Sequence, residues 1–160
     1  MEKREITEIC DLLSKAQQEM LQLEQETNAL YTCTVDEIPL CVERRAACAA
    51  RVDTQFQQIY QICDTDPRGM LRKAVRSQTL FEEVPEELHC IFEARRQLNA
   101  VIHRILQIEP QVLERLQAER EKLLEQIREN NRGQSANASR YLGALNSGQD
   151  VHFTTPGRKI

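Results

Sequence analysis

Apolar residues recur every three or four positions along three long stretches of the chain, and this spacing predicts three amphipathic helices. The first helix is predicted over residues 4–30, where most of the other positions are Glu, Gln, Lys or Asp. Because a single apolar stripe has to be covered by another surface, the helix is expected to pack against a neighbour. Its stripe consists of Ile6, Ile9, Leu13, Ala16, Met20, Thr27, Leu23 and Leu30.

The second helix is predicted to begin near Asp36, whose side chain can cap a helix start and whose charge suits the positive end of the helix dipole. Arg45 interrupts its apolar stripe, and we expect the aliphatic stem of this arginine to lie along a neighbouring helix. Asp-Pro and Gly within residues 64–69 predict a loop, and a short helix over 70–78 is expected to follow. The stripe alternates steps of four and three, as in a coiled-coil seam: Ile38, Val42, Arg45, Ala49, Val52, Phe56, Ile59 and Cys63.

The third stripe is the longest and predicts a helix that begins near Pro85 and ends at residues 130–133, which read Asn-Asn-Arg-Gly. Pro110 lies in the middle of this helix. Because proline cannot donate a backbone hydrogen bond and its ring crowds the preceding turn, we expect a kink or a short break there. From Gln134 onward Ser, Asn, Gly and Thr become frequent, which is typical of a mobile segment.

These patterns predict an all-α fold, an antiparallel bundle of about three long helices over residues 1–132 with a mobile C-terminal tail over 133–160. Composition agrees, because straight-chain residues that favour helices outnumber the aromatic and β-branched residues that favour strands. The end of the third helix is expected to reach past its two shorter neighbours. Its uncovered residues would then form a partner-binding strip or a dimer seam, with ordinary core packing as the alternative. The candidates are Leu113, Leu116, Leu123, Leu124 and Ile127, and in the tail a docking segment with Tyr141, Leu142 and Leu145.

The distribution of charged and apolar residues limits which classes of partner are expected. The chain has 21 Lys and Arg against 25 Asp and Glu, a formal net charge of −4, and the two signs alternate over residues 114–132. Nucleic-acid binding is not expected, because it needs a basic stripe or patch. No run approaches the about 20 apolar residues that cross a bilayer, so no membrane span is expected. The charged start of the chain does not resemble a secretory signal, and a cytoplasmic location is the expectation.

Motifs for catalysis and metal binding are missing from the sequence. No glycine-rich phosphate loop, zinc-protease motif or nucleophile elbow occurs. His89 and Cys90 are adjacent, but neighbours on a helix point roughly 100° apart, which is poor geometry for a nucleophile and its base. The six cysteines contain no Cys-x-x-Cys pair, and we interpret them as reduced thiols that pack as small apolar residues, with a metal site or a disulfide as the alternatives. We therefore predict no catalytic residue, no cofactor, no metal site and no enzymatic activity.

The order of these segments resembles that of the FlgN-like flagellar export chaperones. The similar features are the first helix 12-LLSKAQQEMLQLEQETNAL-30, the Asp-led start 36-DEIPLCVERRAACAARVD-53, the exit 128-RENNRG-133, and the tail 140-RYLGAL-145 followed by an aromatic residue and 156-PGR-158. This resemblance implies a cytoplasmic protein that holds hook-associated proteins before type III export. It also implies that their C-terminal helical segment packs on residues 113–127 and on Tyr141, Leu142 and Leu145. Two alternatives stay open: a self-associating coiled-coil scaffold or homodimer, and a regulatory helical module that binds a secretion or transcription component.

Overall fold

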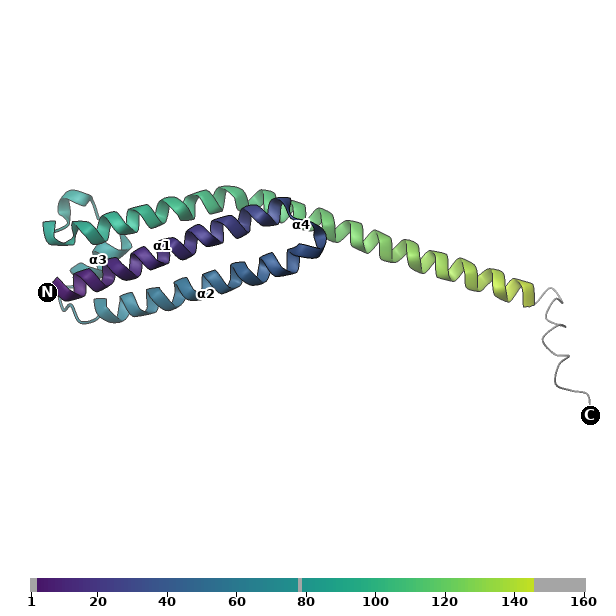
Figure 1. Cartoon of the computed structure of the whole chain (residues 1–160), viewed down its shortest axis with the longest axis horizontal. Helices are drawn as coiled ribbons and strands as arrows, with labels where there is room; N and C mark the ends of the chain where they lie inside the picture. Colours follow the sequence, from purple (N-terminus) through teal and green to yellow (C-terminus); the bar gives the residue numbers. More distant parts are fainter. Residues whose placement is uncertain (1–2, 78, 146–160) are drawn as a thin grey trace, which may run out of the picture. The chain divides into compact units, whose positions relative to one another are not determined.

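The computed structural model describes residues 3–77 and 79–145 (Figure 1). Within those ranges every regular element is helical, so the predicted all-α class is confirmed. In chain order the elements are α1 (Lys3–Thr32), the 3-10 helix η1 (Val35–Glu37), α2 (Ile38–Cys63), α3 (Met70–Arg76), the 3-10 helices η2 (Phe81–Glu83) and η3 (Glu86–Leu88), and α4 (His89–Ala144).

The chain forms two compact units that divide between Arg115 and Leu116, so α4 contributes to both of them. The first unit is an antiparallel helical bundle: α1, α2 and the first part of α4 lie side by side, and α2 runs antiparallel to the other two (Figure 1). The second unit, as far as it is described, is the remaining length of α4 and Leu145.

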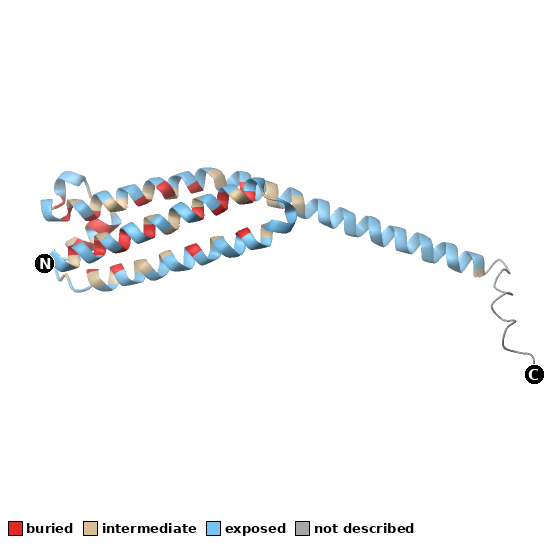
Figure 2. Ribbon diagram, in the orientation of Figure 1, coloured by how far each residue is buried: buried red, intermediate tan, exposed pale blue. Residues whose placement is uncertain are grey.

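The core of the first unit lies between these three helices, with α3 closing one end (Figure 2). The predicted stripe of α1 is confirmed, because Ile9, Leu13 and Ala16 are completely buried. Each large apolar side chain that is removed from water in this way stabilises the fold by about 1.5–3 kcal/mol. Their partners in the core come from the other helices and include Ile59, Cys63, Leu71, Val75, Leu88, Ile91 and Leu98.

The predicted face of α2 is wrong by one residue over the first half of the helix. Val42 is 46% exposed, whereas Cys41 is 6% exposed and Cys48 is 1% exposed. Neighbouring residues are about 100° apart around a helix, so a stripe that is assigned one residue too late lies on a side that faces water. Cysteine is small and apolar, and it suits a seam where two helices come close. In the second half of the helix the prediction holds, since Ile59 and Cys63 are both buried.

Arg45 shows how the seam of α2 accommodates a charged residue. Its Nε donates a hydrogen bond of 3.0 Å to Thr27 Oγ1 of α1, and its guanidinium pairs with the Glu109 carboxylate of α4. Thr27 is completely buried, and its hydroxyl donates in turn to the Leu23 carbonyl at 2.7 Å. Arg45 therefore lies along its neighbours as expected, and it links all three long helices.

Arg115 performs a similar task at the end of α1. Its guanidinium donates to the Leu30 carbonyl at 2.5 Å and also to the Cys33 carbonyl. The last carbonyls of a helix have no partner within the helix, and a cation near them also suits the negative end of the helix dipole. Arg115 thus closes the C-terminal end of α1 from α4.

The predicted end of the longest helix is wrong, because α4 continues through residues 130–133 to Ala144. Pro110 lies inside α4, so the helix has no break there, and the kink that we expected as the alternative stays a prediction. The predicted stop depends on Gly133, yet a glycine inside a helix costs only about 1 kcal/mol relative to alanine, so it weakens the helix without ending it. Residues 133–144 of the predicted tail are therefore helical, and residues 146–160 lie outside the described part of the chain.

Candidate partner-binding face of α4

The second unit carries large apolar side chains that none of the described residues covers. Every residue from 120 to 144 is exposed, and among them are Leu123 (48% exposed), Ile127 (54%) and Tyr141 (58%). Leu124 and Leu142 are exposed as well, while Leu116 and Leu145 are half-buried. Figure 2 shows the contrast with the first part of α4, where buried positions recur along the helix.

These residues share one side of the helix. Successive residues of an α-helix are about 100° apart, which places Leu116, Leu123 and Ile127 within about 40° of one another. Tyr141 and Leu145 return to the same direction after the intervening turns. We call this side the distal apolar face, and the whole set falls within an arc of roughly 100°. Its members are Leu116, Leu123, Leu124, Ile127, Tyr141, Leu142 and Leu145.

The structure therefore joins two groups that the sequence predicted separately. The leucines before residue 128 were expected on a helix, and the later group was expected in a tail segment. Because α4 continues to Ala144, both groups lie on the same helix, and Leu145 follows it directly. The face from Leu116 to Leu145 is about 44 Å long at 1.5 Å per residue.

A polar interval divides the distal apolar face into two patches. Residues 128–137 read Arg-Glu-Asn-Asn-Arg-Gly-Gln-Ser-Ala-Asn and contain no large apolar side chain. Ile127 and Tyr141, which border the interval, are about 21 Å apart along the helix axis. A partner that covers both patches must therefore be an elongated element, such as a helix.

Charged side chains lie on and beside the first patch, which extends from Leu116 to Ile127. Lys122 pairs with Glu119 and Arg128 pairs with Glu125, each at 3.6 Å within the helix. Arg120 occupies the middle of the patch by its position on the helix, and no ion pair of Arg120 occurs among the described residues. The first patch is thus apolar with a cation at its centre and paired charges at other positions around the helix.

Leu113 differs from the other predicted residues because it belongs to the first unit. It is 65% exposed, although its neighbour Val112 is buried. Leu113 is therefore on the solvent side of the first unit, as predicted for a partner surface, but it is not a member of the distal apolar face.

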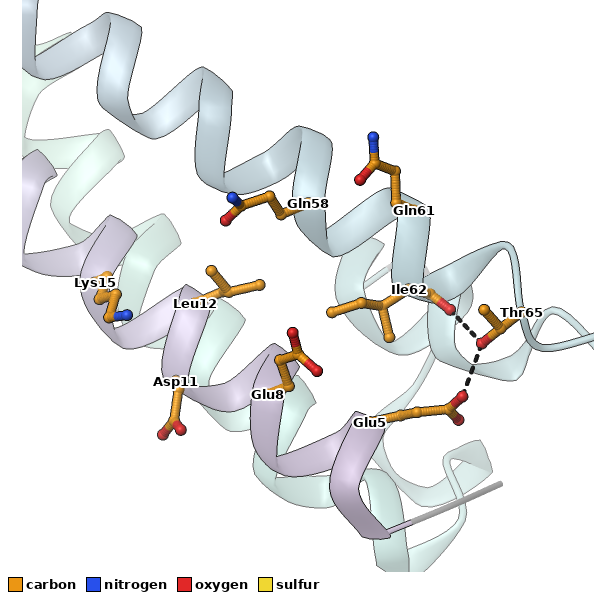
Figure 3. Close-up of a pocket in the computed structure, with 9 residues that line it drawn as sticks. All are labelled: Glu5, Glu8, Asp11, Leu12, Lys15, Gln58, Gln61, Ile62 and Thr65. Atoms are coloured by element: carbon orange, nitrogen blue, oxygen red, sulfur yellow. Dashed lines mark hydrogen bonds between the residues drawn. The ribbon is translucent and has the colours of Figure 1, made fainter.

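A cleft with a volume of about 630 Å³ lies between the N-terminal part of α1 and the C-terminal part of α2 (Figure 3). Leu12 and Ile62 face each other across it, and the carboxylates and amides around them are Glu5, Glu8, Asp11, Gln58 and Gln61, with Lys15 and Thr65. The Thr65 hydroxyl donates to Glu5 at 3.0 Å. The acidic groups are spread along one helix at its surface and do not converge on a buried point, so the cleft does not have the arrangement of an acid and base pair.

The His89 side chain packs against the segment that precedes α4, and the cysteines carry free thiols. The His89 ring stacks on Phe81 with centroids 4.1 Å apart, and its Nε2 lies 2.8 Å from the Val84 carbonyl. Among the described residues, which include all six cysteines, every cysteine is free. Within the same part of the chain no group of His, Cys, Asp and Glu is arranged to hold a metal ion. None of the described helices is both long enough and apolar enough to cross a membrane.

Comparisons with known proteins return no relative. No family model matches the chain, and neither a curated protein nor a solved structure matches it. The distal apolar face therefore has to be interpreted from its own residues.

Proposed function

We propose that this chain is a cytoplasmic export chaperone that binds the C-terminal helical segment of hook-associated flagellar proteins and keeps them soluble before type III export. The observation that carries the proposal is the distal apolar face, a stripe of large exposed side chains along the part of α4 that follows Arg115. The resemblance to the FlgN-like chaperones supplies the class of partner.

The binding mechanism is burial of apolar surface. A partner helix with anchors at positions i, i+3 or i+4, and i+7 would place them against Leu116, Leu123 and Ile127. Each side chain of the face that loses its remaining water contact contributes about 1 kcal/mol. A specific complex needs about 1,200–2,000 Å² of buried surface, which two helices packed along both patches can supply. The partner's own apolar side, which would otherwise promote aggregation, is covered in the same step.

The experiment that tests the proposal is titration calorimetry of the full chain against peptides from the C-terminal ends of the hook-associated proteins of the same organism. We expect saturable binding with a negative heat-capacity change, the mark of buried apolar surface. The double variant Leu123→Ser/Ile127→Ser should bind at least roughly tenfold more weakly, because it removes two anchors.

Leu40→Ser is the matched control, because Leu40 of α2 is 48% exposed, as Leu123 is, and lies in the first unit on a different helix. It should bind as the unchanged chain does. Equal weakening in the control and in the double variant would show that the face does not bind the peptide. No heat with any peptide, from a chain whose helical content is intact, would exclude the proposed function.

A self-associating coiled coil is the second candidate, because the steps of three and four along Leu116, Arg120, Leu123 and Ile127 also suit a seam between two copies. Arg120 distinguishes the two. In a parallel pair in register, two Arg120 guanidinium groups would meet at the seam, and like charges there are unfavourable. Measurement of the molar mass in solution separates the candidates, since a stable oligomer that dissociates in the Leu123→Ser/Ile127→Ser variant would favour the scaffold.

A further inference from the structure

Two cysteines that are distant in the sequence meet near one end of the first unit. Cys10 belongs to α1 and Cys90 to the first turn of α4, 80 positions later, yet their Sγ atoms are 3.2 Å apart. The Cys10 thiol donates a hydrogen bond to the Cys90 sulfur. Their neighbours Ile9 and Ile91 are completely buried, so the packing of the two helices holds the sulfur atoms in place.

The distance is close to that of a covalent link. A disulfide has an S–S length of about 2.05 Å, so the two sulfur atoms would need to approach by only about 1.2 Å.

The two thiols differ in their exposure to solvent. Cys90 is exposed, so a reagent in solution reaches it, whereas Cys10 is half-buried beside it. An accessible thiol with a second thiol in contact is the arrangement of cysteines that oxidise reversibly, because the second thiol resolves the first product. Cys41, Cys48 and Cys63 are instead buried in the bundle.

We propose that Cys10 and Cys90 are a modification site, at which a small disulfide such as glutathione disulfide converts the two thiols into a reversible link between α1 and α4. In the first step the Cys90 thiolate attacks the reagent, a mixed disulfide forms, and one reagent thiolate leaves. In the second step Cys10 loses its proton and attacks Cys90 Sγ, and the second reagent thiolate leaves. The protein loses two protons and two electrons, and the reagent is reduced to two thiols.

The link would close a ring of about 80 residues that contains all of α2 and α3. A disulfide stabilises a protein mainly by restricting its unfolded chain, and the effect increases with the size of the ring. We therefore expect oxidation to raise the Tm of the first unit by on the order of 10 °C. The inference does not depend on the identity of any binding partner.

A second pair of thiols supplies a control. Cys33 and Cys41 are also neighbours, at the turn between α1 and α2, where Cys33 adds to the effect of burial in raising the pKa of the Cys41 thiol. Arg115 Nη1 donates to Cys33 Sγ at 3.6 Å. The variant Cys33→Ser removes this pair from the experiment and leaves Cys10 and Cys90 unchanged.

The test is to incubate the reduced full chain with glutathione disulfide and to measure its intact mass, its cross-linked peptides without reduction, and its Tm. We expect a mass loss of two hydrogen atoms, a peptide pair joined through Cys10 and Cys90, a higher Tm, and reversal by dithiothreitol. Cys33→Ser should give the same result. Cys90→Ser changes an exposed position, so it should fold normally and form no link.

Cys10→Ala should stop at a glutathione adduct on Cys90 and show no rise in Tm. The proposal is overturned if the unchanged chain keeps glutathione on Cys90, if two chains become joined through Cys90, or if the link forms without raising the Tm.

Discussion

The two parts of α4 should respond differently to the same substitution. Leu98 is completely buried in the core of the first unit, whereas Leu123 is 48% exposed on the distal apolar face. Leu→Ala at a site like Leu98 removes the transfer free energy of the side chain and leaves a cavity, which together cost about 3–4 kcal/mol. The same change at Leu123 creates no cavity in the free chain, so it should alter stability by less than about 0.5 kcal/mol. Helix propensity changes equally in both variants, because both residues lie inside α4.

The assay is urea unfolding followed by far-ultraviolet circular dichroism. With a slope of about 2 kcal/mol/M, a loss of 3–4 kcal/mol moves the unfolding midpoint of Leu98→Ala down by about 1.5–2 M, while Leu123→Ala should unfold with the midpoint of the unchanged chain. The loss is a large part of the about 5–15 kcal/mol that stabilises a typical domain, so the Leu98 variant will have little stability left.

Two results would refute the reasoning. A midpoint of Leu123→Ala as low as that of Leu98→Ala would mean that the distal apolar face is covered in the free chain and is ordinary core. A midpoint of Leu98→Ala within 0.3 M of the unchanged chain would mean that α4 does not pack in the bundle as described.

The other predictions concern the links of the first unit and its thiols. Removal of Arg45 or of Glu109 should each destabilise the chain by about 1–2 kcal/mol, and the double variant should cost less than the sum, which a double-mutant cycle in urea will measure. Arg115→Ala should cost about 1–3 kcal/mol because it leaves two carbonyls at the end of α1 without a donor, and Arg115→Lys should recover part of the loss in the same assay. Burial raises the pKa of Cys10 to about 12 and that of Cys63 to about 11, from 9.0 for a free thiol. The folded chain then holds these protons more firmly than the unfolded chain, so the stability they give is complete below pH 9 and is lost as the pH rises to 11–12. Melting of the reduced chain between pH 8 and pH 11 checks this, and an unchanged Tm over that interval would contradict it.

The bundle of the first unit was predictable because its cause is visible in the sequence. Ile9, Leu13 and Ala16 recur at helical spacing among charged residues, and burial of that stripe is what stabilises α1. Any partner helix can cover such a stripe, so the prediction did not require the partner to be known. Arg45 was predictable for a related reason, since a long aliphatic stem can lie along a helix and still bring its charge to the surface.

The face of α2 was not predictable to one residue. Val42 and Cys41 belong to two stripes with the same three-and-four spacing, and spacing alone does not choose between stripes about 100° apart. The choice depends on which side chains fit the gap to α1 and α4. The small thiols of Cys41 and Cys48 fit it, although valine is the residue that a sequence pattern favours.

The length of α4 was not predicted correctly, because the residues that often end a helix can also occur inside one. Pro110 and Gly133 each have a cost inside a helix, about 3 kcal/mol and about 1 kcal/mol respectively, but neither forbids the helix to continue. The meeting of Cys10 and Cys90 had no signal in the sequence at all, because it depends on the packing of two helices that are 80 positions apart.

The continuity of α4 has a consequence for how the distal apolar face works. An isolated helix is marginal in water, and residues 128–137 weaken this one further with asparagines and Gly133. The helix from Leu116 to Ala144 should therefore unfold easily in the free chain. It should gain most of its stability when a partner covers both patches. Hydrogen exchange measures this directly. Amides of residues 116–144 should exchange much faster than those of α1 in the free chain, and binding of a partner peptide should protect them on both sides of the polar interval. Protection limited to residues 116–127 would show that the second patch takes no part in binding, and slow exchange over the whole segment in the free chain would show that self-association already covers the face.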